Sequence, residues 1–106
     1  MSTEIKYLND ENFTQEISSG VTLVDFYADW CGPCRMMEPV IEELSKEMAG
    51  KAKIAKLDIE AAGQTTSTFN VTSIPTIILF KNGEEAERFV GVKSKDDLVR
   101  IIGKHL

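Results

Sequence analysis

The sequence predicts an α/β fold, with a central mixed β-sheet of about five strands flanked by four helices. Apolar runs alternate with helix-like segments in the order β-α-β-α-β-α-β-β-α, an alternation that places helices on both faces of a sheet. The last two strands are separated by Asn82-Gly83, a dipeptide typical of a tight hairpin turn and therefore of an antiparallel pair. The 106 residues contain no repeat, linker or low-complexity tract, which predicts a single domain over 1–106.

The first part of the chain is expected to form an edge strand, a helix and a central strand. Residues Glu4–Leu8 alternate weakly between apolar and polar and predict a short edge strand. Asn9 or Asp10 is expected to cap the first helix, and Gly20 to end it. The run Val21–Ala28 is apolar at nearly every position, which predicts a central strand buried on both faces.

A long amphipathic helix is expected next. Its apolar residues recur every three or four positions, at Met37, Val40, Ile41, Leu44 and Met48. Pro39 lies inside this segment and predicts a kink, because proline removes a helical hydrogen bond. Gly50 is expected to end the helix.

The second half of the chain supplies the remaining elements. Lys53–Ile59 predicts a second buried strand, and Ala61–Asn70 a short helix, although its run of threonines is a poor helix former. Ile77–Phe80 and Ala86–Val90 are the expected strands of the hairpin. Ser94 is expected to cap the last helix. The buried face of that helix is predicted to contain Leu98, Ile101 and Ile102.

Charge and hydropathy narrow the classes of function. There are 17 acidic and 12 basic residues, and the net charge of −5 argues against nucleic acid as a main partner. No apolar run approaches the ~20 residues that a membrane span requires. The first residues are polar and do not resemble a signal peptide, so the expected compartment is the reducing cytosol.

The chemistry is expected to lie in Trp30-Cys31-Gly32-Pro33-Cys34, which holds the only two cysteines. Residues i and i+3 in a first helical turn share a face, with Cβ atoms ~5–6 Å apart, and a disulfide requires ~3.5–4.5 Å. A small change in the turn therefore closes or opens the bond. Gly32 supplies backbone freedom, and Pro33 suits the first helical position. The spacing predicts a dithiol that cycles between thiols and disulfide.

Two structural explanations of the cysteine pair are weaker. A stabilising disulfide usually closes a long loop in a domain that lacks a core, and neither condition holds here. A zinc site needs about four ligands, and the chain offers two cysteines and His105.

The two sulfurs are expected to differ. Cys31 is expected to face solvent at a helix start, where free N–H groups and the helix dipole favour a thiolate, so it is the predicted nucleophile. Cys34 lies one turn further in, is expected to be more shielded, and is the predicted resolving cysteine.

Three other residues have two interpretations each. Asp25 interrupts the apolar central strand and is either a hydrogen-bonded core acid or a proton carrier for the dithiol with a raised pKa. Lys56, taken alone, is a solvated charge at a strand end. Trp30 is either half-exposed packing or a contact residue beside the dithiol.

Residues Val24–Cys34, with the letters VDFYADWCGPC, resemble the active-site stretch of the thioredoxin family. The resemblance covers essentially the whole chain. Further matching segments are Lys56-Leu57-Asp58, Ser73-Ile74-Pro75-Thr76, Phe80-Lys81-Asn82-Gly83 and Val90-Gly91. This resemblance implies a thioredoxin fold. It also implies a protein-disulfide reductase that uses the Cys31-Cys34 disulfide and no other cofactor or metal.

The resemblance also implies roles for individual residues. Asp25 would lie behind Cys34 and transfer its proton, with Lys56 approaching from the adjacent strand to tune that acid. Pro75 would be cis and pack against the dithiol. The implied substrate contact surface is a small apolar rim consisting of Trp30, Gly32, Pro33, Ile74, Pro75, Gly91 and Val92.

The partners implied are disulfide-containing proteins and a thioredoxin reductase, for a monomeric cytoplasmic protein without membrane or nucleic-acid contacts. One alternative is a non-redox module that docks to a larger enzyme. Another is an oxidant or isomerase, which would need export and usually a histidine between the cysteines.

The chain departs from the family pattern in several places. Tyr27 stands where many relatives carry a second tryptophan, and Ala61-Ala62-Gly63-Gln64 replaces the usual turn. Arg35 and Val92 are milder changes. These departures leave the choice of reductase and substrates open.

Overall fold

The computed structural model of the chain describes residues 4–106, and it has the predicted order of elements. The strands are β1 (Ile5–Leu8), β2 (Val21–Tyr27), β3 (Lys53–Asp58), β4 (Thr76–Lys81) and β5 (Glu84–Val90). The helices are α1 (Phe13–Glu16), α2 (Gly32–Glu47), α3 (Gly63–Thr68) and α4 (Lys95–Gly103). No helix in this described part has the length and apolar character needed to cross a bilayer.

The strands form one mixed sheet in the order β1-β3-β2-β4-β5. β3 runs parallel to both β1 and β2, whereas β4 is antiparallel to both β2 and β5. The predicted hairpin is confirmed, since Asn82 and Gly83 both have positive φ, at 52° and 88°. β5 begins at Glu84, two residues before the expected strand, because pairing with β4 continues to the turn.

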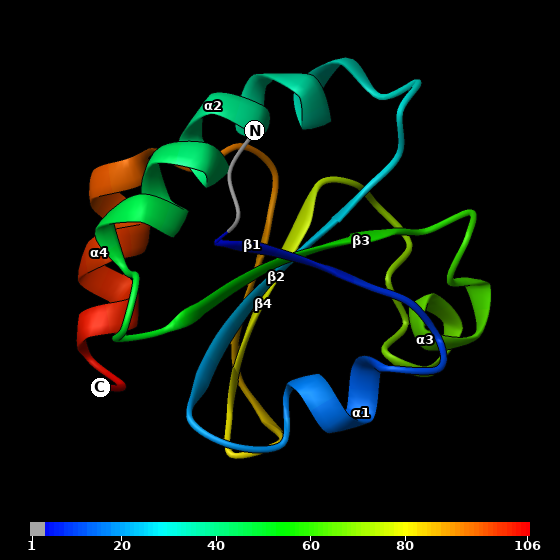
Figure 1. The fold of residues 1–106 in the computed structure, drawn as a ribbon. Helices are drawn as coiled ribbons and strands as arrows, with labels where there is room; N and C mark the ends of the chain where they lie inside the picture. The colour runs from blue at the N-terminus through cyan, green and yellow to red at the C-terminus, as the bar shows by residue number, and fades with distance from the viewer. Residues whose placement is uncertain (1–3) are drawn as a thin grey trace.

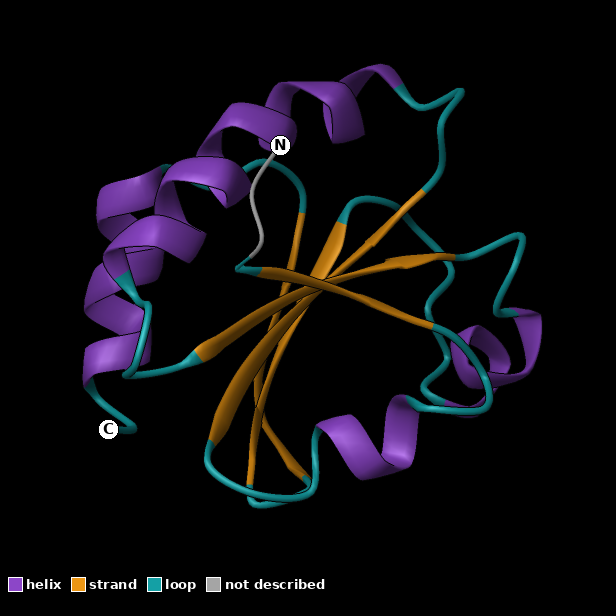
Figure 2. Cartoon of the chain, in the orientation of Figure 1, coloured by secondary structure: helices purple, strands orange, loops and turns teal. Residues whose placement is uncertain are grey.

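Helices cover both faces of the sheet, as expected. α2 and α4 lie over one face, and α1 and α3 lie over the other (Figures 1 and 2). Each face has its own apolar core. The α2 side includes Leu23, Ile41, Leu44, Ile54, Ile77, Leu98 and Ile102, and the α1 side includes Phe13, Val24, Phe26, Leu57, Ile78 and Phe80.

The alternation of side chains along a strand places the acid of the central strand on the α2 side. Leu23 of β2 packs in the α2 core, so Asp25 and Tyr27, two and four residues further, share its face. Ile54 of β3 packs in the same core, which puts Lys56 on this face too. Asp25 and Lys56 are direct neighbours in the parallel β2–β3 pair.

The cap expected at Asn9 or Asp10 lies one turn before the assigned start of α1, and Asn9 rather than Asp10 makes the cap-type hydrogen bonds. α1 begins only at Phe13, and its N-cap residue Asn12 makes no side-chain cap hydrogen bond. The Asn9 side chain accepts from the backbone N–H groups of Glu11 and Asn12, and its carbonyl accepts from the N–H of Phe13, so it caps the turn that leads into α1. The Asp10 carboxylate reaches across to α3, where it accepts from Thr65.

Tertiary contacts explain why the threonine-rich segment is helical. The Asp10 carboxylate accepts from the backbone N–H of Thr65 at 2.8 Å and from its hydroxyl at 2.7 Å. The hydroxyls of Thr66 and Thr68 donate to carbonyls four residues earlier, those of Ala62 and Gln64. The Asp10 bond satisfies an N–H group that the first turn of the helix leaves open, and this tertiary contact offsets the poor propensity of threonine. The hydroxyls of Thr66 and Thr68 satisfy only their own hydrogen-bonding needs.

Candidate active site

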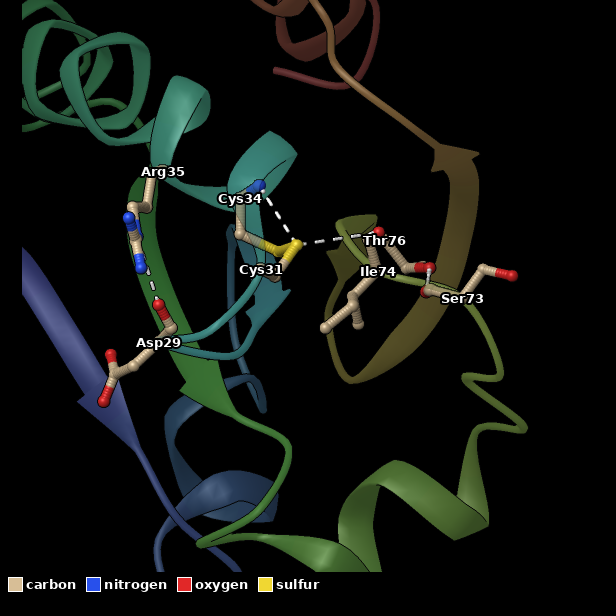
Figure 3. The surroundings of a disulfide bond; sticks show 7 residues. All are labelled: Asp29, Cys31, Cys34, Arg35, Ser73, Ile74 and Thr76. Atoms are coloured by element: carbon tan, nitrogen blue, oxygen red, sulfur yellow. Dashed lines mark hydrogen bonds between the residues drawn. A yellow bond between two sulfur atoms is a disulfide. The ribbon is translucent and has the colours of Figure 1, made fainter.

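The two cysteines form a disulfide at the start of α2, with their Cα atoms 5.2 Å apart (Figure 3). β2 ends at Tyr27, and a short loop leads to Cys31, the N-cap residue of α2 with extended backbone. Pro33 occupies the second helical position rather than the expected first. The shift of Pro33 by one position loses no hydrogen bond, because none of the first four N–H groups of a helix has an intrahelical partner.

The helix start is directed at the sulfur of Cys31. The backbone N–H of Cys34 donates to Cys31 Sγ at 3.2 Å. On the other side, Cys31 Sγ lies 3.9 Å from the carbonyl oxygen of Ile74, which Figure 3 shows facing the disulfide. A thiolate at Cys31 would therefore meet an N–H donor and the positive end of the α2 dipole.

The expectation that Cys31 faces solvent is wrong for the disulfide state. Only 5% of Cys31 and 3% of Cys34 are exposed, so the two residues differ little in accessibility. They pack in a small apolar cluster with Ala28, beside Ile59 and Ile74. Hydrogen bonding, rather than exposure, distinguishes the sulfurs here, because the Cys34 N–H donates to Cys31 Sγ.

Asp25 is buried without a full set of partners. Its side chain is 1% exposed, and its Oδ1 has no hydrogen-bond partner among the described residues. Burial raises the pKa of Asp25 to about 7, although the charge of Lys56 acts to lower it, and Glu38 of α2 adds a smaller upward effect. The acid can thus exchange a proton near neutral pH, which is the property expected of a proton carrier.

Lys56 is more buried than a solvated strand-end charge would be. It is 9% exposed, and its Nζ lies 4.3 Å from the centroid of the Tyr27 ring. Burial and the nearby acids Asp58 and Asp29 raise the pKa of Tyr27 to about 12, so the phenol is neutral at physiological pH. This contact was not predicted from the sequence, although Tyr27 lies two residues after Asp25 and therefore on the same strand face.

Pro75 joins the loop before β4 to the segment after β5. The Ile74–Pro75 peptide bond is cis, as the resemblance implies. The carbonyl of Pro75 accepts from the backbone N–H of Gly91 at 2.9 Å, and Gly91 has φ +102°. The Thr76 hydroxyl donates to the Ser73 carbonyl, which holds the same loop closed (Figure 3).

The members of the predicted rim differ in exposure. Ile74 lies against the disulfide, Pro75 is buried, and Gly91 is half-buried. The exposed members are Trp30, Gly32, Pro33 and Val92, and Trp30 is 62% exposed. The indole N–H of Trp30 donates to Glu60 Oε2 at 2.9 Å.

Three residues near the rim were not predicted. Glu60, which holds the Trp30 indole, follows β3 by two residues, and the parallel β2–β3 pair brings both strand ends to the same edge of the sheet. Met36 and Val90 are exposed apolar side chains on α2 and β5. Met36 is four residues after Gly32, so it lies on the same side of the helix as the rim.

A disulfide between residues three apart at a helix N-terminus, beyond the carboxyl end of a central strand that itself carries a buried acid, defines a thiol–disulfide oxidoreductase.

Comparison with known proteins gives the family. The family model described as Thioredoxin matches residues 4–104. The thioredoxin of Chlamydia muridarum is 50% identical over 101 residues, which cover 95% of this chain and 98% of the relative. The thioredoxin of Staphylococcus saprophyticus is 50% identical over 99 residues, covering 93% and 95%. The chain belongs to the thioredoxin family, and its activity is that of a protein-disulfide reductase.

Proposed function

We propose that Cys31 is the nucleophile and Cys34 the resolving cysteine of a disulfide-reduction cycle. The observation that carries this assignment is the N–H of Cys34, which donates to Cys31 Sγ at 3.2 Å. The same contact would stabilise a Cys31 thiolate once the disulfide is reduced, and the helix dipole would add to it. No comparable donor to Cys34 Sγ is found among residues 4–106.

The cycle transfers two electrons by two exchange steps. The Cys31 thiolate attacks one sulfur of a substrate disulfide, forms a mixed disulfide and releases the first substrate thiolate. Cys34 loses its proton and attacks Cys31 Sγ, which releases the second substrate thiolate and closes the Cys31-Cys34 disulfide. The substrate is reduced and the protein is oxidised.

Asp25 is the proposed acceptor of the Cys34 proton, and Lys56 tunes it. The support is that Asp25 lies beneath α2 with a pKa of about 7, close to neutral pH. Proton transfer is most effective when the pKa of the base lies near the working pH. Lys56 acts through its charge, as the adjacent residue on β3.

The proposed substrate surface is the rim around the disulfide. Its exposed members Trp30 and Val92 offer apolar contact, and the backbone around Ile74 and Pro75 lies close enough to the sulfur to hold an extended substrate segment. Gly91 and the exposed Gly32-Pro33 turn border this surface. A surface of exposed apolar side chains beside accessible backbone suits a protein substrate better than a small molecule, which usually requires a concave pocket.

The proposed cycle also needs a reductase and a compartment. The oxidised protein is re-reduced by a thioredoxin reductase, and the disulfide is the only redox group it needs. The chain acts as one domain and as a monomer in the cytoplasm. The continuous sheet from β1 to β5 supports the single domain.

Turnover tests the proposal. The wild-type protein should accelerate the reduction of insulin by dithiothreitol, followed as turbidity, and Cys31→Ser should abolish the acceleration. Cys34→Ser should instead accumulate a mixed disulfide with the substrate, because Cys31 can attack but nothing resolves the product. No acceleration by the wild type would favour the non-redox docking module, and trapping by Cys31→Ser but not Cys34→Ser would reverse the two roles.

A further inference from the structure

Two groups on the α2 face of the sheet compete for the ammonium of Lys56. One is the Tyr27 ring, whose centroid lies 4.3 Å from Lys56 Nζ. The other is the carboxyl of Asp25, the in-register neighbour of Lys56. Within residues 4–106, the ion pairs of 4.0 Å or less involve other cations and not Lys56. Asp25 Oδ1 has no hydrogen-bond partner there.

This arrangement is unusual for a buried acid beside a buried amine. Each group loses hydration on burial, and a direct ion pair is the ordinary way to recover part of that loss. Lys56 is instead over an aromatic face, where a cation is attracted by the ring quadrupole, and more strongly when water is excluded. The ring can therefore hold the ammonium against the attraction of the carboxyl.

We propose that Tyr27 is a positioning residue whose ring keeps Lys56 out of a direct ion pair with Asp25, so that Asp25 can take up a proton. Lys56 then influences Asp25 through its charge at a distance rather than by contact. The catalytic meaning of this inference rests on the proton-transfer role proposed for Asp25. The positioning itself does not depend on that role.

The charged groups around Asp25 and Lys56 leave the Tyr27 ring a neutral partner for the Lys56 ammonium. The pKa of Tyr27 is about 12 and that of Asp25 about 7, so the phenol stays neutral while the carboxyl titrates. From α2, Glu38 acts on Asp25, and from β4 the in-register residue is the apolar Ile77. Asp58 of β3, Asp29 of the following loop and Tyr7 of β1 act on Tyr27.

The experiment is an NMR titration of the Asp25 side-chain carboxyl in the oxidised protein, where the cysteines do not titrate. Tyr27→Leu frees the ammonium to pair with the carboxylate. Proton binding by Asp25 should then weaken about tenfold or more, since an opposite charge within ~4–6 Å lowers a carboxyl pKa by 1–3 units. Tyr27→Phe keeps the ring and should leave the titration unchanged. If Tyr27→Leu does not fold, Tyr27→Met takes its place.

Two controls separate this effect from general disturbance. In a Lys56→Met background, Tyr27→Leu should no longer change the titration of Asp25. Tyr7→Leu removes a ring from the β1 residue that is also in register with Lys56, and it should leave the titration unchanged.

An unchanged or stronger proton affinity in Tyr27→Leu would overturn the inference, and so would an equal shift in Tyr27→Phe. Insulin reduction by Asp25→Asn is measured in parallel. Unimpaired turnover there would remove the proton-transfer role of Asp25, while the titration would still decide what Tyr27 does.

Discussion

At the scale of single residues, the burial of Asp25 lowers the free energy of unfolding of the protein when its carboxyl is ionised. Its carboxyl lies on the central strand under α2, almost fully buried, and burial is the first cause of its raised pKa. The folded chain therefore holds this proton more tightly than the unfolded chain does. A site that can exchange a proton near pH 7 is obtained at the expense of stability.

The pH range in which Asp25 lowers the stability of the folded protein can be predicted. With a pKa of about 7 when folded and ~3.9 when unfolded, Asp25 binds more protons in the folded state between those values, so its contribution to stability falls as the pH rises. Asp25→Asn should be more stable than the wild type by roughly 4 kcal/mol above pH 7, at ~1.36 kcal/mol per pKa unit, and the gain should shrink toward pH 4. Guanidinium denaturation of the oxidised proteins at pH 4.5 and pH 8.5 measures it. A difference that does not change with pH would contradict the assignment.

At the scale of elements, the segment after β5 needs a glycine for a backbone reason. Gly91 has φ +102°, and a Cβ placed on it would meet no atom within 4 Å. Its N–H donates to Pro75, which ties the end of β5 to the cis-proline loop. The requirement is conformational, not steric, because non-glycine residues rarely adopt this φ.

Gly91→Ala should therefore destabilise the protein by about 1–3 kcal/mol even though the new methyl group finds open space. The matched control is Gly32→Ala, which also meets no atom within 4 Å but does not have a positive φ. We expect its stability to stay within ~0.5 kcal/mol of the wild type. Urea denaturation of the oxidised proteins compares them, and equal losses at both positions would show that φ is not the cause.

The short helix α3 depends on a distant acid. Thr65→Val keeps the branched shape but removes the hydroxyl that donates to Asp10, and it should cost about 1 kcal/mol. Thr68→Val is the control, since the Thr68 hydroxyl is exposed and donates only within the helix, to Gln64. Thermal denaturation measures the effect, and Thr65→Val should lower the melting temperature clearly more than Thr68→Val does. The reverse order would mean that Asp10 does not hold α3.

At the scale of the whole molecule, the sheet separates two apolar cores, and the disulfide lies beyond the carboxyl end of its central strand, β2. Ile41 of α2 packs in one core, and Ile78 of β4 packs in the other. Each is fully buried. The single sheet nevertheless links them, since β4 contributes side chains to both faces.

Ile41→Val and Ile78→Val should each cost about 0.5–1.5 kcal/mol. Since they lie on opposite faces without shared partners, the double variant should show their sum within ~0.5 kcal/mol. If 1–106 is one domain, every variant should unfold in one cooperative transition by both fluorescence and circular dichroism. Two separate transitions would contradict the single domain.

Prediction from sequence succeeded where a local pattern decides the structure. The alternation of elements, the Asn82-Gly83 hairpin and the Ser94 cap, which accepts from the N–H of Asp97, all follow from residues close in the chain. Element ends were less accurate. β2 stops at Tyr27 and β3 at Asp58, one residue before each predicted end, because pairing in the sheet sets those limits.

The disulfide pairing of Cys31 with Cys34 was predicted correctly, but the exposure of Cys31 was not. Cys31 was expected to face solvent, yet it is buried in a cluster against which Ile59 and Ile74, from distant segments, pack. Asp10 was one of two candidates to cap α1, but its carboxylate binds the N–H of Thr65 in α3. Contacts of this kind join residues far apart in the chain, so no local spacing contains them.

The sequence by itself determined the dithiol, the order of the elements and the family, because each depends on residues that lie close together in the chain. Only the tertiary structure decided how the groups around the dithiol balance one another. The pKa of Asp25 and the placement of Lys56 over Tyr27 arise from burial and from strand pairing. Both effects depend on distance in space, which the order of residues does not specify.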